Sequence, residues 1–158
     1  MVYILDTNIF RKLLEHFPKK GKSFEIVWDK IDENIANKSI LSVDECYNEL
    51  SNHYSSDNAN FLWIKARKEM FLNPTDEESI MLKELFQKTK MQESIHTKNI
   101  LTNRPSADAY LAVKAKTLGG TLVTSETYKP NSAQLPNICE ELGVKCISYD
   151  DFMELFSQ

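Results

Sequence analysis

The fold is decided by the opening stretch of the chain, Val2-Tyr3-Ile4-Leu5-Asp6-Thr7-Asn8-Ile9-Phe10. Its first four residues are a short β-branched and aromatic run, which predicts a buried strand. The next three are residues that favour the N-terminus of a helix, and apolar residues then recur at helical spacing as far as Phe17. The stretch therefore predicts a strand, an acid and a helix, with the Asp6 carboxylate at the carboxyl end of the strand.

The strand and helix pattern recurs further along the chain. We predict strands at Ser39–Val43, Thr121–Thr124 and Val144–Ser148, separated by helical segments, with no strand evident between Asn58 and Asn103. Parallel strands need crossover connections, which helices usually supply. We therefore expect one α/β domain over residues 1–158, with a mainly parallel central sheet of about four strands flanked by helices. Functional groups in such sheets collect beyond the carboxyl ends of the strands.

Length, charge and cysteine content exclude several classes of protein. A chain of 158 residues can bury one continuous core. A net charge of −4 argues against a protein that coats DNA non-specifically, because such binding depends on clustered Lys and Arg. Cys46, Cys139 and Cys146 lack CxxC spacing and lie among apolar residues as reduced core cysteines do, so we expect no disulfide framework. The three histidines are far apart and none has a ligand-type partner three or four residues away, so we expect no structural zinc site. The apolar runs are too short to span a membrane and no secretory leader precedes Asp6, so we expect a cytoplasmic protein.

Four acids lie where the predicted sheet would bring them together. Asp6 follows the first strand, Glu49 lies on the helix after the second, Asp108 falls in the first turn of a helix that begins at Pro105, and Glu126 follows the third. Each alone is explained as a helix cap or a solvated carboxylate. Together they would repel one another unless cations lie between them, and ligands that are all oxygen suit Mg²⁺ or Mn²⁺. The acids therefore point to phosphate chemistry.

The order of these motifs resembles that of PIN domains, in particular the VapC-like toxins and an uncharacterised PIN-like branch. The segments that carry the resemblance are Tyr3–Phe10, Val43–Leu50, Ala107–Ala112, Thr121–Glu126 and Leu135–Cys146, which together span nearly the whole chain. The resemblance implies a three-layer PIN-like fold and a metal-dependent ribonuclease that acts on single-stranded RNA. It also implies an antitoxin partner, because many such proteins are toxins neutralised by one, and it suggests a homodimer.

The resemblance also assigns roles to individual residues. The family's catalytic, metal-binding acids fall on Asp6, Glu49 and Asp108. Its fourth position, commonly Asp, falls on Glu126, which is one methylene longer. One bound metal would lower the pKa of a water to create hydroxide, and a second cation would offset charge on the phosphate. The expected products carry 5′-phosphate and 3′-hydroxyl ends.

Other polar side chains near the acids have expected roles in substrate binding. We expect Thr7, Asn8, Thr124 and Ser125 to orient the substrate, the first two because they match the polar pair that follows the first acid of the family. The candidates for guiding the RNA backbone are Arg11, Lys12, Arg104, Lys114 and Lys116, although solvated helix charge also accounts for each of them.

Two other functions remain open from the sequence. A phosphatase of the haloacid-dehalogenase type also begins with a strand that ends in Asp, but it needs a second Asp where Asn8 stands. A catalytically weakened PIN-like module could instead bind a partner, since Glu126 departs from the family and the helical region 58–103 offers a surface. Nucleotide-binding folds are excluded by the absence of their glycine motifs.

Overall fold

The protein is built around a five-stranded, entirely parallel sheet. The computed structural model describes residues 1–87, 107–127 and 135–157. The strand order is β3-β2-β1-β4-β5, and the strands are β1 (Tyr3–Leu5), β2 (Ile40–Val43), β3 (Phe71–Leu72), β4 (Thr121–Val123) and β5 (Cys146–Ile147). The predicted α/β class and parallel sheet are confirmed, and the sheet has five strands where about four were expected.

The strand that the sequence did not reveal is β3. Helix α4 (Ala59–Ala66) ends early, and the 3₁₀ turn η1 (Lys68–Met70) leads directly into β3. Phe71 then pairs with Ser42 and Leu72 with Val43 in parallel register. The prediction that no strand lies between residues 58 and 103 was wrong, because a strand of two residues is too short to show a period and is specified by its pairing with β2.

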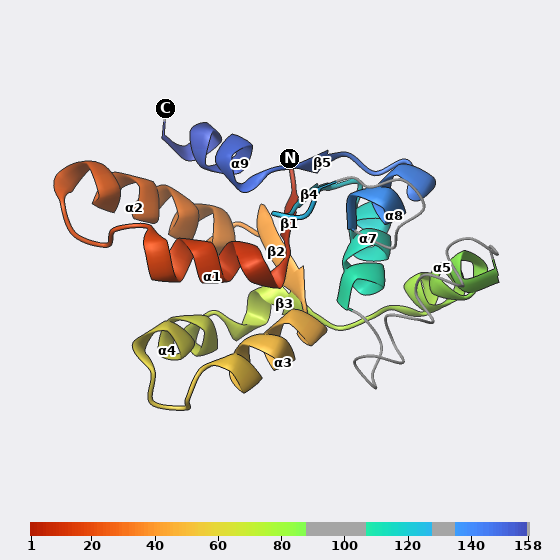
Figure 1. The fold of residues 1–158 in the computed structure, drawn as a ribbon, viewed down its shortest axis with the longest axis horizontal. Coiled ribbons are helices and arrows are strands. Elements are labelled where there is room, and N and C mark those ends of the chain that lie inside the picture. The colour runs from red at the N-terminus through yellow and green to blue at the C-terminus, as the bar shows by residue number, and fades with distance from the viewer. Residues whose placement is uncertain (88–106, 128–134, 158) are drawn as a thin grey trace.

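Helices cover both faces of the sheet and make three layers. In Figure 1, α1, α2 and α9 lie on one side, α7 and α8 on the other, and α3 and α4 beside β3. Contacts of α2 with β2, and of α7 with β1, β2 and β4, agree with this arrangement. No helix in the described part of the chain is long and apolar enough to cross a membrane. The remaining helices span Thr7–His16 (α1), Lys22–Ala36 (α2), Asp44–His53 (α3), Asp76–Gln87 (α5), Ala107–Leu118 (α7), Leu135–Leu142 (α8) and Tyr149–Phe156 (α9).

The core lies on both faces of the sheet, and this explains the composition of the strands. Every residue of β2 and β4 is buried, as are Ile4 and Leu5 in the central strand β1. Parallel strands covered by helices on both faces carry continuous apolar runs rather than alternating ones. The short strands recognised from the sequence have this pattern.

A glycine turn sets the direction of α7 relative to the sheet. Gly119 ends α7 with φ +63°, and a Cβ on Gly120 would lie 3.0 Å from the Val2 carbonyl oxygen, so the chain enters β4 in close contact with β1. With so short a turn, α7 runs back against β4. Its first turn, which contains Asp108, therefore lies toward the carboxyl edge of the sheet.

Candidate active site

Asp6 lies at the carboxyl end of the central strand and is fixed by its neighbours. Its backbone N–H donates to the Val123 carbonyl oxygen of β4 at 3.1 Å. Its Oδ1 accepts the Thr7 N–H at 2.7 Å, which caps α1, and its Oδ2 accepts the Thr124 hydroxyl at 3.0 Å. The side chain is only 5% exposed. Asp6 is thus the helix cap expected from the sequence and also a buried acid aimed beyond the sheet.

The surroundings of Asp6 disfavour its negative charge. Burial raises the pKa of Asp6 from 3.8 to about 6, and the carboxylates of Glu126 and Glu49 add to the rise. The hydrogen bonds from Thr124 and Thr7 oppose this effect only in part. The groups that stabilise the ionised form are therefore a hydroxyl and a backbone N–H rather than Lys or Arg. Such a carboxyl group is one that a bound cation would keep ionised.

Glu49 reaches the same edge from α3, which begins directly after β2. Its Oε2 accepts the Thr7 hydroxyl at 2.5 Å. Because the backbone N–H of Thr7 binds Asp6 while its hydroxyl binds Glu49, this one residue ties the two acids together. The buried Cys46 thiol also lies close by, and burial followed by the charge of Asp6 raises its pKa. This thiol was not expected at the site, since the sequence shows only an apolar helix face.

Glu126 approaches Asp6 from the segment after β4. Its backbone N–H donates to the Thr124 hydroxyl at 3.1 Å, and that hydroxyl in turn donates to Asp6. Its Oε2 accepts the backbone N–H of Leu135, the first residue of α8, at 2.6 Å. Helix N-termini favour negative charge, so the start of α8 is a suitable hydrogen-bonding partner for this carboxylate. The contact with Leu135 could not be predicted from residue types, because a backbone group makes it.

Asp108 lies in the first turn of α7 and is 7% exposed. Helix α7 packs against β1, β2 and α3, the elements that carry or adjoin Asp6 and Glu49. The first turn of α7 lies toward the carboxyl edge of the sheet, so Asp108 lies toward the same edge as the other acids. We call Asp6, Glu49, Asp108 and Glu126 the acidic edge.

The acidic edge provides oxygen donors, but they do not form a complete metal site as they stand. In residues 1–87, 107–127 and 135–157, no three His, Cys, Asp or Glu side chains form a group able to hold a metal ion as they stand. Glu49 is turned toward Thr7 and Glu126 toward Leu135. The donor set fits a hard cation by its chemistry, since the carboxylates of Glu126 and Glu49 act on a buried acid whose stabilising groups include no basic side chain.

The other residues expected at the site lie in varied surroundings. Asn8 is exposed and Ser125 is partly buried. Arg11 pairs with Glu15 at 3.3 Å, and the Lys12 ammonium lies 5.5 Å from the centre of the Tyr149 ring. Lys116 is exposed on α7, and Arg104 lies outside the described residues.

Lys114 differs from the other basic residues because it is buried. Its ammonium lies 2.6 Å from Glu78 Oε1 and donates to the Asn73 carbonyl oxygen at 2.9 Å. Lys114 is 4% exposed and Glu78 is 1% exposed. In place of the expected contact with RNA, we propose that Lys114 joins α7 to α5.

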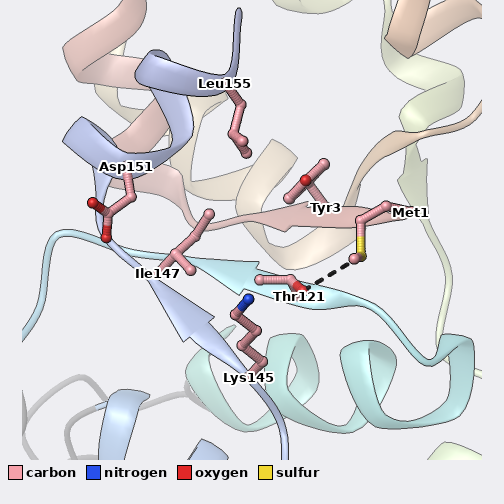
Figure 2. Close-up of a pocket in the computed structure, with 7 residues that line it drawn as sticks. All are labelled: Met1, Tyr3, Thr121, Lys145, Ile147, Asp151 and Leu155. Carbon is pink, nitrogen blue, oxygen red and sulfur yellow. Dashed lines mark hydrogen bonds between the residues drawn. The ribbon is translucent and has the colours of Figure 1, made fainter.

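A cavity of about 370 Å³ lies away from the acidic edge. Figure 2 shows its lining, which comes from the amino ends of β1 and β4, from β5 and from α9. Tyr3 and Thr121 begin their strands here, whereas Asp6 lies beyond the opposite end of β1. The four acids do not line this cavity, so it is separate from the acidic edge. The full lining is Met1, Tyr3, Thr121, Lys145, Ile147, Asp151 and Leu155.

Two solved structures share this fold at low sequence identity. VapBC2 from Rickettsia felis, bound to a DNA fragment from their promoter, contains a chain 15% identical, with 94% of this chain and 98% of that chain covered and a TM-score of 0.53. VapBC-1 from nontypeable Haemophilus influenzae contains a chain 16% identical, with 95% and 99% covered and a TM-score of 0.55. No curated protein matches the chain. Residues 3–157 match the family model described as Domain of unknown function (DUF4411), and the chain therefore belongs to this family.

Proposed function

We propose that the acidic edge binds Mg²⁺ or Mn²⁺ and hydrolyses phosphodiester bonds of single-stranded RNA. The observation that carries this proposal is the state of Asp6, a buried carboxyl group at the centre of the sheet edge whose pKa is raised by burial and by Glu126 and Glu49. A fold has no structural need to gather acids around such a group. A divalent cation bound between the carboxylates would offset their repulsion. Cation binding would therefore explain why the acids lie together.

The four carboxylates would contribute unequally to cation binding. Asp6 would be the central ligand, because its position is fixed by Thr7 and Thr124. Glu49 and Glu126 would turn from their present hydrogen bonds toward the cation, and Asp108 would complete the set from α7. When bound, the cation would supply a water of lowered pKa and offset charge on the phosphate. Thr7 and Thr124 would keep the orientation of Asp6, while Asn8 and Ser125 would contact substrate.

Cleavage of a labelled single-stranded RNA, with and without Mg²⁺ or Mn²⁺, tests this proposal. We expect metal-dependent cleavage that leaves 5′-phosphate and 3′-hydroxyl ends. Asp6→Asn, Asp108→Asn, Glu49→Gln and Glu126→Gln should each reduce it, whereas Glu140→Gln, at an exposed position on α8, should not. Cleavage that is independent of metal, or unchanged in D6N, would contradict the proposal.

The resemblance to VapC-like toxins extends the proposal to a toxin held inactive by an antitoxin. The similar solved structures are of VapBC proteins, which supports a search for a partner encoded beside this chain. Induced expression should arrest growth, D6N should relieve the arrest, and co-expression of the neighbouring gene product should also relieve it. The oligomeric state of the purified chain, measured by light scattering, tests the homodimer suggested by the same resemblance.

A second candidate function is a binding module without turnover. It is favoured by the engagement of Glu126 with Leu135 and by the lack of a closed ligand set among the described residues. The two functions predict different results for D6N. A module would bind its partner equally well in wild type and D6N and would show no turnover with Mn²⁺, whereas the nuclease would lose its activity in D6N.

A further inference from the structure

The positive charge of the chain is concentrated in one segment, residues 11–22. This segment contains five Lys or Arg and a single acid, Glu15, so it carries a net charge of +4. The whole chain has a net charge of −4, and the remaining residues together therefore carry −8. The segment begins five residues after Asp6. A basic surface thus follows the acidic edge directly in an otherwise acidic protein.

Helix α1 joins the acidic edge to the loop that leads into α2. Its ten residues span about 15 Å, and in Figure 1 the loop lies at the left, away from the sheet. Lys12 and His16 are exposed and four residues apart, so they lie on one face of the helix. Glu15 accepts hydrogen bonds from Arg11 Nε at 3.3 Å and from the Tyr54 hydroxyl at 2.7 Å. The one acid of the segment is therefore already engaged.

The loop itself, residues 18–22, is held in place by two contacts. The Pro18 carbonyl oxygen accepts the indole N–H of Trp28, on α2, at 2.8 Å. The Lys19 ammonium donates to Oδ1 of Asn60, on α4, at 3.1 Å. The loop is therefore fixed against two helices and presents its remaining lysines at a defined place.

An exposed aromatic ring lies among these lysines. Phe24 is 39% exposed, and a Cβ on Gly21 would lie 3.2 Å from its ring, so the ring lies against the middle of the loop. Its contact with Phe17, with ring centroids 5.4 Å apart and planes at 85°, fixes its orientation. Lys20 and Lys22 flank Gly21 and are exposed, and no acid in the described part of the chain forms an ion pair with either. Cations beside an aromatic ring are the groups that bind single-stranded nucleic acid.

We propose that residues 18–24 and the exposed cations of α1 bind single-stranded RNA on one side of the scissile phosphate. Lys20 and Lys22 contact phosphates, and the exposed part of the Phe24 ring stacks on a base. This inference rests on the proposed ribonuclease function, because it names the path that the same substrate takes away from the acidic edge. Bases in duplex RNA are already stacked, so a duplex cannot use the ring.

Fluorescence anisotropy of a labelled, unstructured RNA with the full chain in EDTA tests the lysines without cleavage. Lys20→Ala combined with Lys22→Ala should weaken binding about tenfold at low salt. It should also reduce the slope of log K against log salt concentration by about 1.4, since each single-strand phosphate contact contributes about 0.7. Lys83→Ala combined with Lys116→Ala, at exposed positions on α5 and α7, removes the same charge far from the loop. This control should change the affinity by less than about twofold, and equal weakening in the two double variants would overturn the proposal.

Variants of Phe24 test the stacking. Phe24→Leu keeps an apolar side chain against Phe17 but removes the ring, and it should weaken single-strand binding at least about fivefold with an unchanged salt slope. Phe24→Tyr keeps the ring and should retain the affinity. Duplex RNA, and a poly-glutamate peptide that supplies anions without bases, should bind wild type more weakly than the single strand.

Three results would overturn the proposal and can be told apart from failure of the ribonuclease function. They are unchanged affinity in K20A/K22A, unchanged affinity in F24L, and binding of poly-glutamate as tight as that of the single strand. The last result would identify the surface as a site for an acidic peptide. Because binding is measured in EDTA, none of them depends on turnover, whereas a lack of metal-dependent cleavage would contradict the ribonuclease function alone.

Discussion

At the scale of single residues, Asp6 has a structural role and a chemical role that can be separated by substitution. Asn retains an oxygen able to cap α1 through the Thr7 N–H but removes the charge that Glu126 and Glu49 oppose. We expect D6N to fold normally and to cleave RNA at least about 100-fold more slowly. Mutating a residue that only hydrogen-bonds to a metal ligand already reduces metal affinity or activity by about 10–100-fold, and Asp6 would itself be the ligand. Circular dichroism checks the fold and the cleavage assay checks the activity. An unfolded D6N would show that the cap alone requires Asp.

The raised pKa of Asp6 also predicts how stability depends on pH in the absence of metal. The pKa is 3.8 when unfolded and about 6 in the fold, so the folded state holds a proton between these values that the unfolded state has lost. Stability therefore falls as pH rises from about 4 to about 6, and the full loss, about 3 kcal/mol for roughly two pKa units, persists above pH 6.

Urea unfolding in EDTA at pH 5, 6 and 7 measures this dependence. Wild type should gain free energy of unfolding as the pH is lowered from 7 to 5. D6N lacks the titrating group and should show less of this gain. Parallel curves for the two proteins would mean that Asp6 is not the group responsible.

At the scale of secondary-structure elements, the buried pair Lys114–Glu78 joins α7 to α5. Lys114→Met leaves the Glu78 carboxylate buried without its cation, which should lower the free energy of unfolding by about 3–5 kcal/mol. Adding Glu78→Gln should restore part of the loss. The exposed neighbour gives the control, since Lys116→Met should change stability by only about 0.5 kcal/mol. Stability that is unchanged in K114M together with weakened RNA binding would support the phosphate contact expected from the sequence.

Elements that have a clear period were predicted from the sequence, and contacts between distant segments were not. Strand β1 and helix α1 were recognised because an apolar run, a capping acid and a helical repeat follow one another. Helix α7 is buried along most of its length from Ala107 to Ala115, so its sequence does not show which side faces solvent. The burial of Lys114 therefore could not be predicted from its position around the helix, because it depends on the ion pair with Glu78, thirty-six residues earlier. Strand β3 was missed for the same reason, since only its pairing with β2 specifies it.

At the scale of the whole molecule, the acidic edge brings together segments from both ends of the chain. Asp6 belongs to the first strand, Glu49 to α3, and Glu126 to the segment that leads to α8. The parallel sheet explains this convergence, because successive crossovers return each strand end to the same edge. The sequence could predict that edge from the strand ends, but not the hydrogen bonds of Glu49 and Glu126, which depend on the fold around them.

A cation held by these segments would bind the native state and not the unfolded chain, so it should stabilise the whole fold. At a Mn²⁺ concentration 100 times its dissociation constant, the gain in free energy of unfolding is about 2.7 kcal/mol. It should be largest above pH 6, where metal-free Asp6 carries the charge that the cation offsets. Thermal unfolding of wild type and D6N, with Mn²⁺ and with EDTA, measures the effect. We expect the melting temperature of wild type to rise with Mn²⁺ and that of D6N to remain nearly constant, and an equal rise in both proteins would place the cation away from Asp6.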